Sequence, residues 1–402
     1  MGHPEFADAK RLWLLDPSVT YLNHGSFGAC PLAVLYAQQA WRARMEFQPV
    51  HFIVRDGERM LEAARTELGR FLGADPADLA FVHNATSGVN TVVRSLEFEP
   101  GDELLTINHA YNACRNVLEY VAGRSRARVV VAPVPFPIDS PDRVVEAVLA
   151  AVTPRTRLAM LDHVTSPTGL VLPIERLVQE LAERGIDTLV DGAHAPGMLP
   201  LDLNRLGAAY YTGNGHKWLC APKGVAFLWV RRDRQERIRP LVISHGANAL
   251  RSDCSRFRIE FDYLGTDDIS GYLAAAEAVR YVGSLLPGGW PALMERNRAQ
   301  VLRGRAILAE AMGVSPPCPE SMIGSIATLP LPDGSTRPPQ SAFDTDPLQD
   351  ALLRRHRIEV PIFTWPGAPR RWIRVSAQLY NVDADYERLA AALREELAAP
   401  RT

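Results

Sequence analysis

Residues 187–228 read DTLVDGAHAPGMLPLDLNRLGAAYYTGNGHKWLCAPKGVAFL, and this stretch decides how the rest of the chain is interpreted. An apolar run ends in Asp191, His194 follows three residues later, and Lys217 stands 26 positions after the acid, within Gly-His-Lys-Trp. A lysine can form a Schiff base with an aldehyde, and a carboxylate can keep a pyridine nitrogen protonated. The stretch therefore predicts a pyridoxal 5'-phosphate site, with Lys217 on the cofactor aldehyde and Asp191 on the ring nitrogen.

Apolar strands and helical runs alternate on both sides of this stretch. The predicted strands cover residues 79–82, 103–107, 127–132, 157–164, 187–191, 207–212 and 225–230. This alternation is typical of a mostly parallel sheet covered by helices, so we expect an α/β fold with a seven-stranded sheet. Ligands of such sheets bind beyond the carboxyl ends of the strands, where Ser87, His109, Ser166 and Asp191 fall.

The two ends of the chain differ in character from this alternating part. We expect residues 1–30 to form an N-terminal arm, residues 31–260 the large domain, and residues 261–402 a small α+β domain that includes the connection. Helical patterns cover residues 31–47, 57–72, 173–184, 269–286, 290–312 and 384–398.

The C-terminal part also contains predicted strands and loops. Residues 325–330 and 373–377 have the pattern of strands, and the Pro-rich residues 329–347 that of a surface loop. Residues 244–266 are polar and irregular, which predicts a loop over the site followed by the connection to the small domain.

The composition excludes several classes of partner. The chain has 402 residues, 47% of them hydrophobic and 22% charged, with a formal net charge of -2. This balance argues against nucleic acid or an anionic membrane as a partner. No stretch approaches the roughly 18 apolar residues of a membrane span, and the N-terminus lacks a signal-peptide pattern. The five cysteines are dispersed, which predicts reduced thiols, no metal site and a cytoplasmic location.

The glycine-spaced turn YLNHGSFG at residues 21–28 has two interpretations. It can be a tight corner, or its backbone can line a ligand with Asn23 among the contacts. The residues leave both open, and Asn23 is a candidate for binding substrate.

A possible phosphate site follows the strand at residues 79–82. Ala85, Thr86 and Ser87 open the next helix, where free backbone N–H groups, hydroxyls and the helix dipole attract an anion. Ser and Thr also cap helices that bind nothing, so this signal gains weight only from the neighbouring motifs.

His109 and Tyr111 follow the strand at residues 103–107. Either ring could stack on a pyridine ring at the sheet edge, and either could simply pack a loop. The residues alone leave these interpretations open, and the family resemblance described below favours His109 for stacking, with Tyr111 as the alternative.

Motifs spread from Tyr21 to Asn381 carry a family resemblance. They are LNHGSFG, SPTGLVLP, VDGAHAPGM, HKWLCAP, HRIEVP and IRVSAQLYN. With them the chain resembles fold-type I pyridoxal phosphate enzymes of the class V aminotransferase group, and within that group isopenicillin N epimerase and its relatives. The resemblance covers nearly the whole chain, but the same fold serves epimerases, desulfurases, carbon–sulfur lyases and transaminases.

The resemblance implies a role for each matching residue. Lys217 would hold the cofactor and carry the proton, Asp191 would pair with the pyridine nitrogen, and His194 would reach the ring hydroxyl with Ser166 nearby. A buried lysine can be tuned toward a neutral pKa for this purpose. Arg374, in Ile-Arg-Val-Ser, would bind the substrate carboxylate, since guanidinium matches a carboxylate in bidentate fashion.

The resemblance also implies a homodimer with shared active sites. Thr86, Ser87 and His216 would hold the phosphate within one subunit, and Thr266 would reach it from the neighbouring subunit.

One departure bears on the reaction. A desulfurase needs a nucleophilic cysteine on a mobile loop near the substrate arginine, and residues 374–380 contain none. Cys318, in a Pro-flanked loop, is the remaining candidate, so sulfur transfer is disfavoured.

We therefore expect an enzyme that acts at the α-carbon of an amino acid or aminoacyl compound, with an epimerase or racemase as the leading hypothesis. A carbon–sulfur lyase is the second hypothesis, because it shares every step up to the carbanion, and an aminotransferase is the third. A non-catalytic pyridoxal-binding protein, such as the sensor part of a regulator, is the alternative from another class. The 30-residue arm is too short for the DNA-binding module that a regulator would need.

Overall fold

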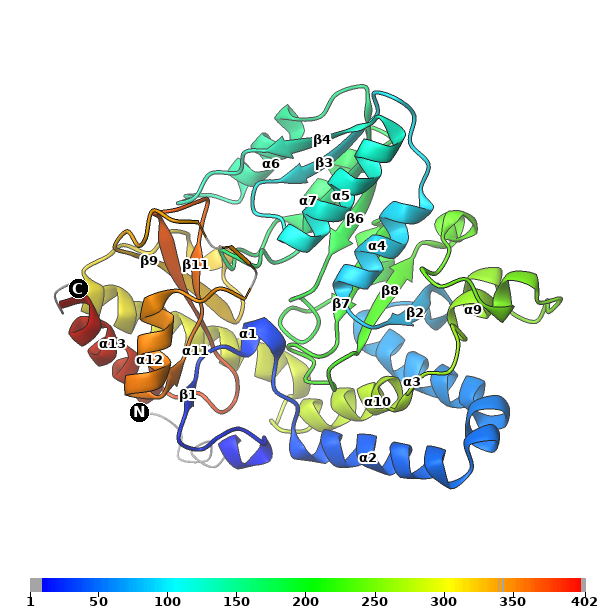
Figure 1. The fold of residues 1–402 in the computed structure, drawn as a ribbon, viewed down its shortest axis with the longest axis horizontal. Helices are drawn as coiled ribbons and strands as arrows, with labels where there is room; N and C mark the ends of the chain where they lie inside the picture. Colours follow the sequence, from blue (N-terminus) through cyan, green and yellow to red (C-terminus); the bar gives the residue numbers. More distant parts are fainter. Residues whose placement is uncertain (1–8, 339, 342, 399–402) are drawn as a thin grey trace.

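A seven-stranded sheet forms the centre of the protein. The computed structural model describes residues 9–338, 340–341 and 343–398. The strand order is β2-β8-β7-β6-β5-β3-β4, as drawn in Figure 1. The bounds are β2 (Leu79–Val82), β3 (Glu103–Ile107), β4 (Arg128–Ala132), β5 (Thr156–Asp162), β6 (Asp187–Asp191), β7 (Tyr210–Asn214) and β8 (Ala226–Val230). β8 runs antiparallel to both of its neighbours, and all other pairings are parallel. The expected α/β fold with a mostly parallel sheet is confirmed.

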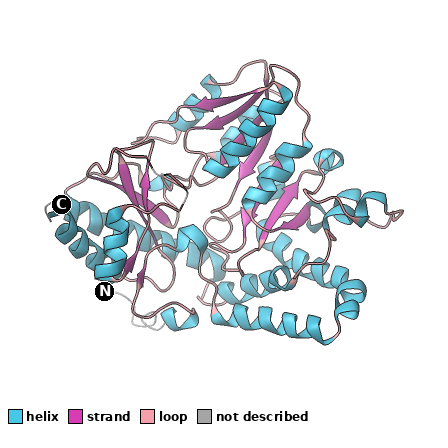
Figure 2. Cartoon of the chain, viewed as in Figure 1, coloured by secondary structure: helices cyan, strands magenta, loops and turns pink. Residues whose placement is uncertain are grey.

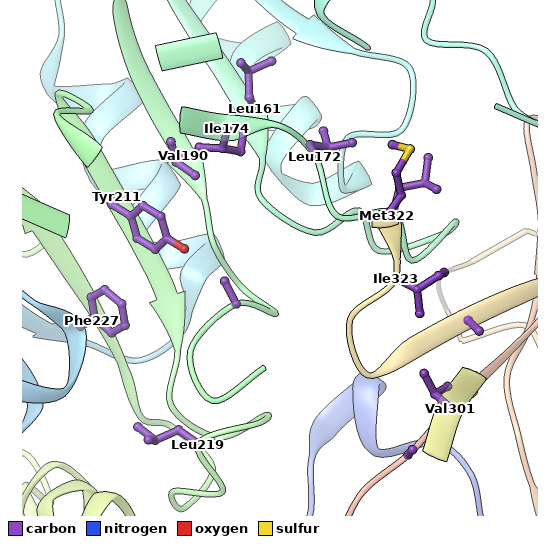
Figure 3. Packing of buried hydrophobic residues seen from close by; sticks show 14 of the residues in the cluster. Leu161, Leu172, Ile174, Val190, Tyr211, Leu219, Phe227, Val301, Met322 and Ile323 are labelled. Atoms are coloured by element: carbon purple, nitrogen blue, oxygen red, sulfur yellow. The ribbon is translucent and has the colours of Figure 1, made fainter. Parts of the chain in front are cut away.

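Helices cover both faces of this sheet (Figure 2). The α-helices of the N-terminal two thirds of the chain have the following bounds: α1 (His24–Phe27), α2 (Leu32–Phe47), α3 (Gly57–Leu72), α4 (Ala85–Ser95), α5 (Asn112–Ser125), α6 (Asp142–Ala150), α7 (Ile174–Ala182), α8 (Leu203–Leu206) and α9 (Arg256–Phe261). Neighbouring strand residues point to opposite faces, so Leu189 packs in one apolar cluster with α4 and α5, and Val190 in another with α7. Figure 3 shows Val190 close to Ile174 of α7. Burial on both faces explains why the strands are continuously apolar.

The described residues of the C-terminal part add a smaller sheet and four α-helices. Strands β9 (Ile326–Leu331), β11 (Ile362–Thr364) and β12 (Arg371–Ser376) form an antiparallel sheet in the order β11-β12-β9. The helices are α10 (Ser270–Gly283), α11 (Gly289–Met312), α12 (Pro347–His356) and α13 (Asp383–Ala398). β12 carries Arg374, which lies opposite Thr328 of β9. The predicted domain limits at residues 30 and 260 stay a prediction.

The N-terminal arm joins the C-terminal part through a second small sheet. β1 (Thr20–Tyr21) pairs in parallel with β10 (Ile358–Glu359), so that Tyr21 lies opposite Glu359. The Leu22 N–H donates to the Glu359 carbonyl. The segment from Asn23 to Gly28 is thereby held against the C-terminal strands.

The predicted helix ends agree with the structure where local signals are strong. α2 begins directly after Pro31, and α3 ends at Leu72 because Gly73 adopts a left-handed conformation with φ 60°. Sequence analysis missed α9, α12, β10 and β11, which are short and carry few apolar residues in a period. None of the described helices combines the length and apolar character that crossing a bilayer requires.

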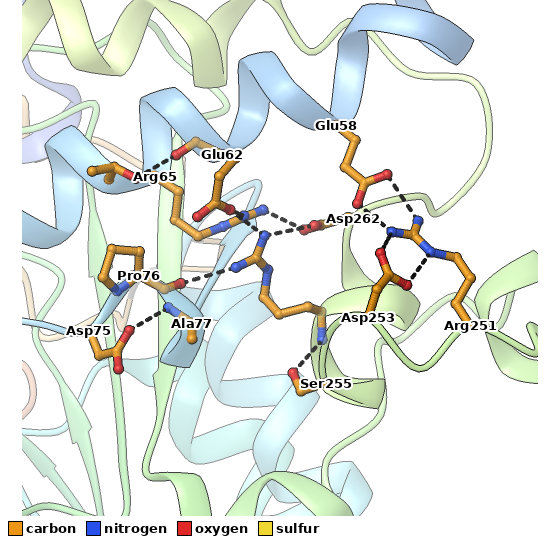
Figure 4. A network of polar contacts seen from close by, with 12 residues as sticks. Glu58, Glu62, Arg65, Asp75, Pro76, Ala77, Arg251, Asp253, Ser255 and Asp262 are labelled. Carbon is orange, nitrogen blue, oxygen red and sulfur yellow. Dashed lines mark hydrogen bonds and ion pairs between the residues drawn. The ribbon is translucent and has the colours of Figure 1, made fainter.

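A charged network ties α3 to α9 (Figure 4). The buried guanidinium of Arg65 contacts Glu62 and Asp262, and Arg258 donates to the same two carboxylates. Nearby, Arg251 bonds Glu58 and Asp253 on the surface. Both contacts attach residues 250–262 to α3, so the segment expected to be a loop over the site is partly ordered by charge.

Candidate active site

Two carboxylates meet at the carboxyl ends of neighbouring strands. Asp191 ends β6 and Asp162 ends β5, and the two residues are register partners. The Cys114 thiol donates to Asp191 Oδ2 at 3.2 Å, and the Ala193 N–H donates to Oδ1 at 3.0 Å. Burial raises the pKa of Asp191, an effect that these two hydrogen bonds and the positive charge of Lys217 oppose. No cation lies within ion-pair distance of Asp191 among the described residues, so this buried carboxylate suits a cationic N–H group of a ligand.

Lys217 lies beside His194. Its Nζ is 3.2 Å from His194 Nε2, while the Trp218 indole N–H donates to His194 Nδ1 at 3.4 Å. Burial, followed by the charge of Arg374, lowers the pKa of Lys217 to about 7. Burial also lowers the pKa of His194 well below its usual range. A neutral His194 that accepts at Nδ1 carries its proton on Nε2 and directs it at the lysine amine.

The N-terminal arm holds the backbone of the Lys217 loop. His24 Nε2 lies 3.0 Å from the Lys217 carbonyl oxygen, and His24 Nδ1 lies 2.8 Å from the Tyr380 hydroxyl. Gly28 has φ 68°, and a Cβ there would stand 2.0 Å from the His216 carbonyl oxygen. The arm therefore packs directly on the loop that positions the lysine, a contact that only glycine permits at residue 28.

The start of α4 offers groups for an anion. Asn84 caps the helix by accepting from the Ser87 N–H and hydroxyl, and the Ala85 N–H donates to Asn214. The Thr86 hydroxyl makes no hydrogen bond to another described residue. A Cβ at Gly88 would stand 2.1 Å from Thr212 Oγ1, so glycine brings the helix start close to β7. Among the residues of α4 predicted to bind the phosphate, Thr86 therefore has a hydroxyl that remains available to an anion.

The other two predicted phosphate residues lie on separate segments. The Nδ1 of His216 lies 3.2 Å from the Val225 carbonyl, and burial lowers the pKa of this imidazole to about 4. Thr266 is exposed on the segment before α10, one residue from Asp267, whose carboxylate is 3.8 Å from His83 Nε2.

His109 and Tyr111 occupy different environments. His109 is 0% exposed, its Nδ1 lies 2.7 Å from the Thr168 hydroxyl, its Nε2 lies 3.1 Å from the Val134 carbonyl, and its ring packs on Trp365. Tyr111 is 46% exposed. Burial and the nearby charge of Asp191 raise the pKa of Tyr111, whereas Arg374 lowers it, so this side chain faces the charged groups of the site.

Arg374 is a buried cation without an acidic neighbour. It is 2% exposed, and no carboxylate lies within ion-pair distance among the described residues. Its guanidinium donates to the Ser166 carbonyl and to the Ser26 hydroxyl, and it lies 4.6 Å from the centre of the Phe363 ring. Burial lowers its pKa to about 10, so the group remains charged at neutral pH. A buried cation with spare N–H groups fits a carboxylate ligand.

Sequence analysis missed four polar residues of this region. Cys114 and Asp162 touch the Asp191 environment, and Ser26 and Glu359 connect to Arg374. Asp162 ends an apolar strand just as Asp191 does, and this pattern could have singled it out. Ser26 lies in the turn YLNHGSFG and Glu359 in the motif HRIEVP, but neither motif shows which residue each side chain contacts, and Cys114 lies in no motif. Tertiary packing brings these three residues to the site.

The comparison with known families agrees with this geometry. A profile of the family described as Aminotransferase class-V matches residues 29–298. The chain belongs to this family. The class V assignment makes the protein an enzyme with pyridoxal 5'-phosphate as its cofactor, as predicted.

Curated relatives of this class V enzyme include isopenicillin N epimerases and L-cysteine desulfhydrases. The isopenicillin N epimerase of Streptomyces clavuligerus is 36% identical, covering 98% of each chain, and that of Amycolatopsis lactamdurans is 39% identical, covering 97% of this chain and 98% of the relative. A probable L-cysteine desulfhydrase of Arabidopsis thaliana is 30% identical over 94% of this chain and 83% of the relative.

Solved structures share the fold of the class V enzyme. A complex of the cystine C–S lyase C-DES has a TM-score of 0.76 at 22% identity, covering 94% of this chain and 97% of the other. The Escherichia coli cysteine desulfurase CsdA has a TM-score of 0.75 at 19% identity, covering 98% and 99%. The fold-type I prediction is confirmed.

The residues fit the cofactor of the family. Its phosphate, ring nitrogen and aldehyde call for an anion site, a carboxylate and a neutral amine. The start of α4, Asp191 and Lys217 supply these groups. The described residues contain one candidate metal cluster, Glu58, Asp253 and Cys254, in which Arg251 already bonds both carboxylates.

Proposed function

We propose that this enzyme epimerises or racemises the α-carbon of an amino acid or aminoacyl compound. Lys217 carries the proposal: its amine has a pKa of about 7, lies beside His194 and shares the site with Arg374. An amine of this pKa can remove and return a proton near neutral pH. The identity of 36 to 39% with isopenicillin N epimerases over nearly the whole chain supports the same reaction class.

Each predicted residue has a part in this proposal. The bound cofactor supplies an electron-withdrawing ring that stabilises negative charge at the α-carbon. Asp191 binds the ring N–H, His194 the ring hydroxyl, and Thr86 with Ala85, Ser87 and His216 the phosphate. Arg374 binds the substrate carboxylate, and Ser166 orients Arg374 through the hydrogen bond from its guanidinium. Asn23 acts through Ser26, whose hydroxyl donates to it at 2.5 Å.

Tyr111, in place of His109, is our proposed stacking residue. The ring nitrogens of His109 are both engaged and the ring is fully enclosed, whereas Tyr111 is half-exposed next to Asp191. Because its pKa is raised, the Tyr111 hydroxyl keeps its proton at neutral pH. It is therefore also a candidate to protonate the face of the α-carbon opposite Lys217.

Hydrogen exchange tests the proposed reaction. Candidate amino acids and aminoacyl peptides are incubated with the cofactor-loaded enzyme in heavy water, and the α-hydrogen and configuration are followed. Deuterium incorporation with inversion, and without formation of a keto acid, is the expected result. Release of pyruvate, ammonia or sulfide would contradict epimerisation.

A carbon–sulfur lyase is the second candidate function. The desulfhydrase relatives, 29 to 30% identical over at least 94% of this chain, favour it. Lysis and epimerisation diverge only after the α-proton is lost, at the β-carbon of the substrate. Release of sulfide from cysteine in the same assay would select lysis, and amino-group transfer to a keto acid would select the aminotransferase alternative. An unchanged cofactor spectrum with every amino acid would favour the non-catalytic alternative.

We also propose that the enzyme is a cytoplasmic homodimer with shared active sites. Large apolar side chains stand exposed on and after α2, among them Tyr36, Phe47, Val50 and Val54. Such a patch is typical of a protein interface. Thr266, exposed and without a hydrogen bond to another described residue, would complete the phosphate site of the neighbouring subunit. The five cysteines are free thiols, as expected of a reducing compartment.

A further inference from the structure

A chain of hydrogen bonds connects the side chains of Glu359 and Arg374. Arg374 has no carboxylate within ion-pair distance, and Glu359 has no cation within that distance, among the described residues. Between them stand Ser26 and Asn23 from the N-terminal arm. The chain of contacts joins β12, α1 and β10.

The hydrogen bonds run in one direction. A terminal N–H of Arg374 donates to the Ser26 hydroxyl at 3.1 Å, the Ser26 hydroxyl donates to Asn23 Oδ1 at 2.5 Å, and the Asn23 amide donates to Glu359 Oε1 at 2.9 Å. Each donor thus points from the cation toward the anion, and hydrogen bonds aligned in this way polarise one another. Asn23 has its carbonyl and its amide engaged, so it cannot turn freely toward a ligand.

An indirect counter-ion has a specific advantage for a carboxylate-binding arginine. A carboxylate in direct contact with Arg374 would occupy the N–H groups that a ligand needs, and it would compete with that ligand. A buried cation with no compensating charge at all would be costly. Glu359 lies two side chains away from the guanidinium, and this arrangement leaves the Nε and remaining N–H groups of Arg374 open to a ligand.

We propose that Glu359, Asn23 and Ser26 are positioning residues that fix the carboxylate-binding geometry of Arg374, an inference that rests on the proposed function of this arginine. These residues do not touch the reacting atoms. Their removal should therefore weaken the binding of a substrate carboxylate and leave the proton-transfer chemistry at Lys217 unchanged.

The test compares two probes that differ only in the carboxylate. L-alanine and L-alaninamide have no extended side chain, so they report on the amine and carboxylate contacts alone. Each is titrated against the cofactor-loaded enzyme, and the change in cofactor absorbance gives the Kd. Ser26→Ala removes a hydrogen bond to the charged guanidinium, and Glu359→Gln removes the negative charge while keeping an acceptor for the Asn23 amide, so each is expected to raise the Kd of alanine about tenfold. The Kd of alaninamide should stay within about twofold.

A matched control and a steady-state readout separate positioning from folding. Asp16 is a surface carboxylate of the same arm that pairs with Arg357, next to β10, so Asp16→Asn should leave both Kd values within about twofold. With the substrate found by hydrogen exchange, Glu359→Gln should raise KM about tenfold while kcat changes less than about threefold. The double variant Glu359→Gln/Ser26→Ala should lose no more than Ser26→Ala alone, because without the Ser26 hydroxyl the charge of Glu359 no longer acts on Arg374 through the chain.

The possible outcomes distinguish this inference from the proposed function. A wild-type enzyme that binds alaninamide as tightly as alanine would contradict the role of Arg374 itself. If the wild-type enzyme prefers alanine and the variants keep the full preference, the positioning role of Glu359, Asn23 and Ser26 is overturned. The role of Arg374 in binding the carboxylate then still stands. Equal weakening of both probes would show a general structural effect and would also overturn the inference.

Discussion

The pKa of the Lys217 amine is close to neutral pH. Burial and Arg374 lower its pKa to about 7. Below that pH the amine is protonated and cannot attack the cofactor aldehyde, and above it the amine is free. We therefore expect the rate at which cofactor-free enzyme captures pyridoxal phosphate to rise with pH and to level off above about pH 8. Stopped-flow absorbance measures this rate, and a rise that continued to about pH 10, as for an ordinary lysine, would contradict the assignment.

The rarity of lysine allows a clean test of which residue holds the cofactor. The chain contains three lysines, Lys10, Lys217 and Lys223. Borohydride reduction of the loaded enzyme should fix the cofactor mass on Lys217 alone, as peptide mass spectrometry can check. Lys217→Ala should abolish this labelling and lower activity by about a thousandfold. Lys223 is the control, because it is the lysine nearest in sequence to Lys217 and bonds the Gly28 carbonyl of the arm, and labelling at Lys223 would refute the prediction.

Replacing Tyr111 and replacing His109 are expected to have different effects: the first on cofactor affinity, the second on stability. If Tyr111 stacks on the cofactor ring, Tyr111→Ala should weaken cofactor binding about tenfold and Tyr111→Phe should not. His109→Asn should lower the melting temperature, since it disturbs the contacts to Thr168 and Val134, with cofactor affinity within about twofold of the wild type. Titration of the cofactor-free variants with pyridoxal phosphate measures these affinities. A loss of affinity in His109→Asn but not in Tyr111→Ala would identify His109 as the stacking residue.

The contact between α3 and α9 is predicted to contribute to stability through charge. Arg65 is 1% exposed and bonds Asp262, whose pKa burial raises to about 7. Arg65→Met would remove one of the two cations that contact Asp262 and leave Arg258 as the other, and we expect a loss of about 2 kcal/mol in the free energy of unfolding. Arg70→Met on the same helix breaks an exposed pair with Glu67 and should cost less than about 1 kcal/mol. Urea denaturation of both variants measures the difference, and equal losses would show that burial of the pair does not matter.

The whole molecule exposes an apolar surface that a second copy should cover. This surface comprises Phe47, Val50 and Val54 at and after the end of α2. Val54→Asp should shift the enzyme to monomers and, if Thr266 acts in the neighbouring subunit, weaken cofactor binding as well. Sedimentation measures the first effect and cofactor titration the second.

Tyr120→Asp serves as the control for this surface. Tyr120 is similarly exposed on α5, a helix of the opposite end of the molecule (Figure 1), next to Arg94 and Arg124. It should leave the oligomeric state unchanged. A wild-type monomer, or a Val54→Asp dimer, would contradict this interface.

The sequence by itself determined the strands of the large sheet, the ends of several helices and the cofactor of the family. These features depend on local signals: apolar runs of strand length, Gly73 after α3, and an acid and a lysine in motifs with recognisable neighbours. Asp191, His194, Lys217 and Arg374 could be named because each follows or lies within such a run.

Tertiary structure alone decided how these residues are supported. The antiparallel direction of β8, the burial of His109 and the contacts of Cys114 with Asp191 depend on which segments pack together. In the hydrogen-bond chain from Arg374 to Glu359, Arg374 and Ser26 are 348 positions apart in the sequence, and Asn23 and Glu359 are 336 positions apart. No periodicity or motif encodes contacts over such separations, because the partner of a polar side chain is decided only when distant segments of the chain pack together.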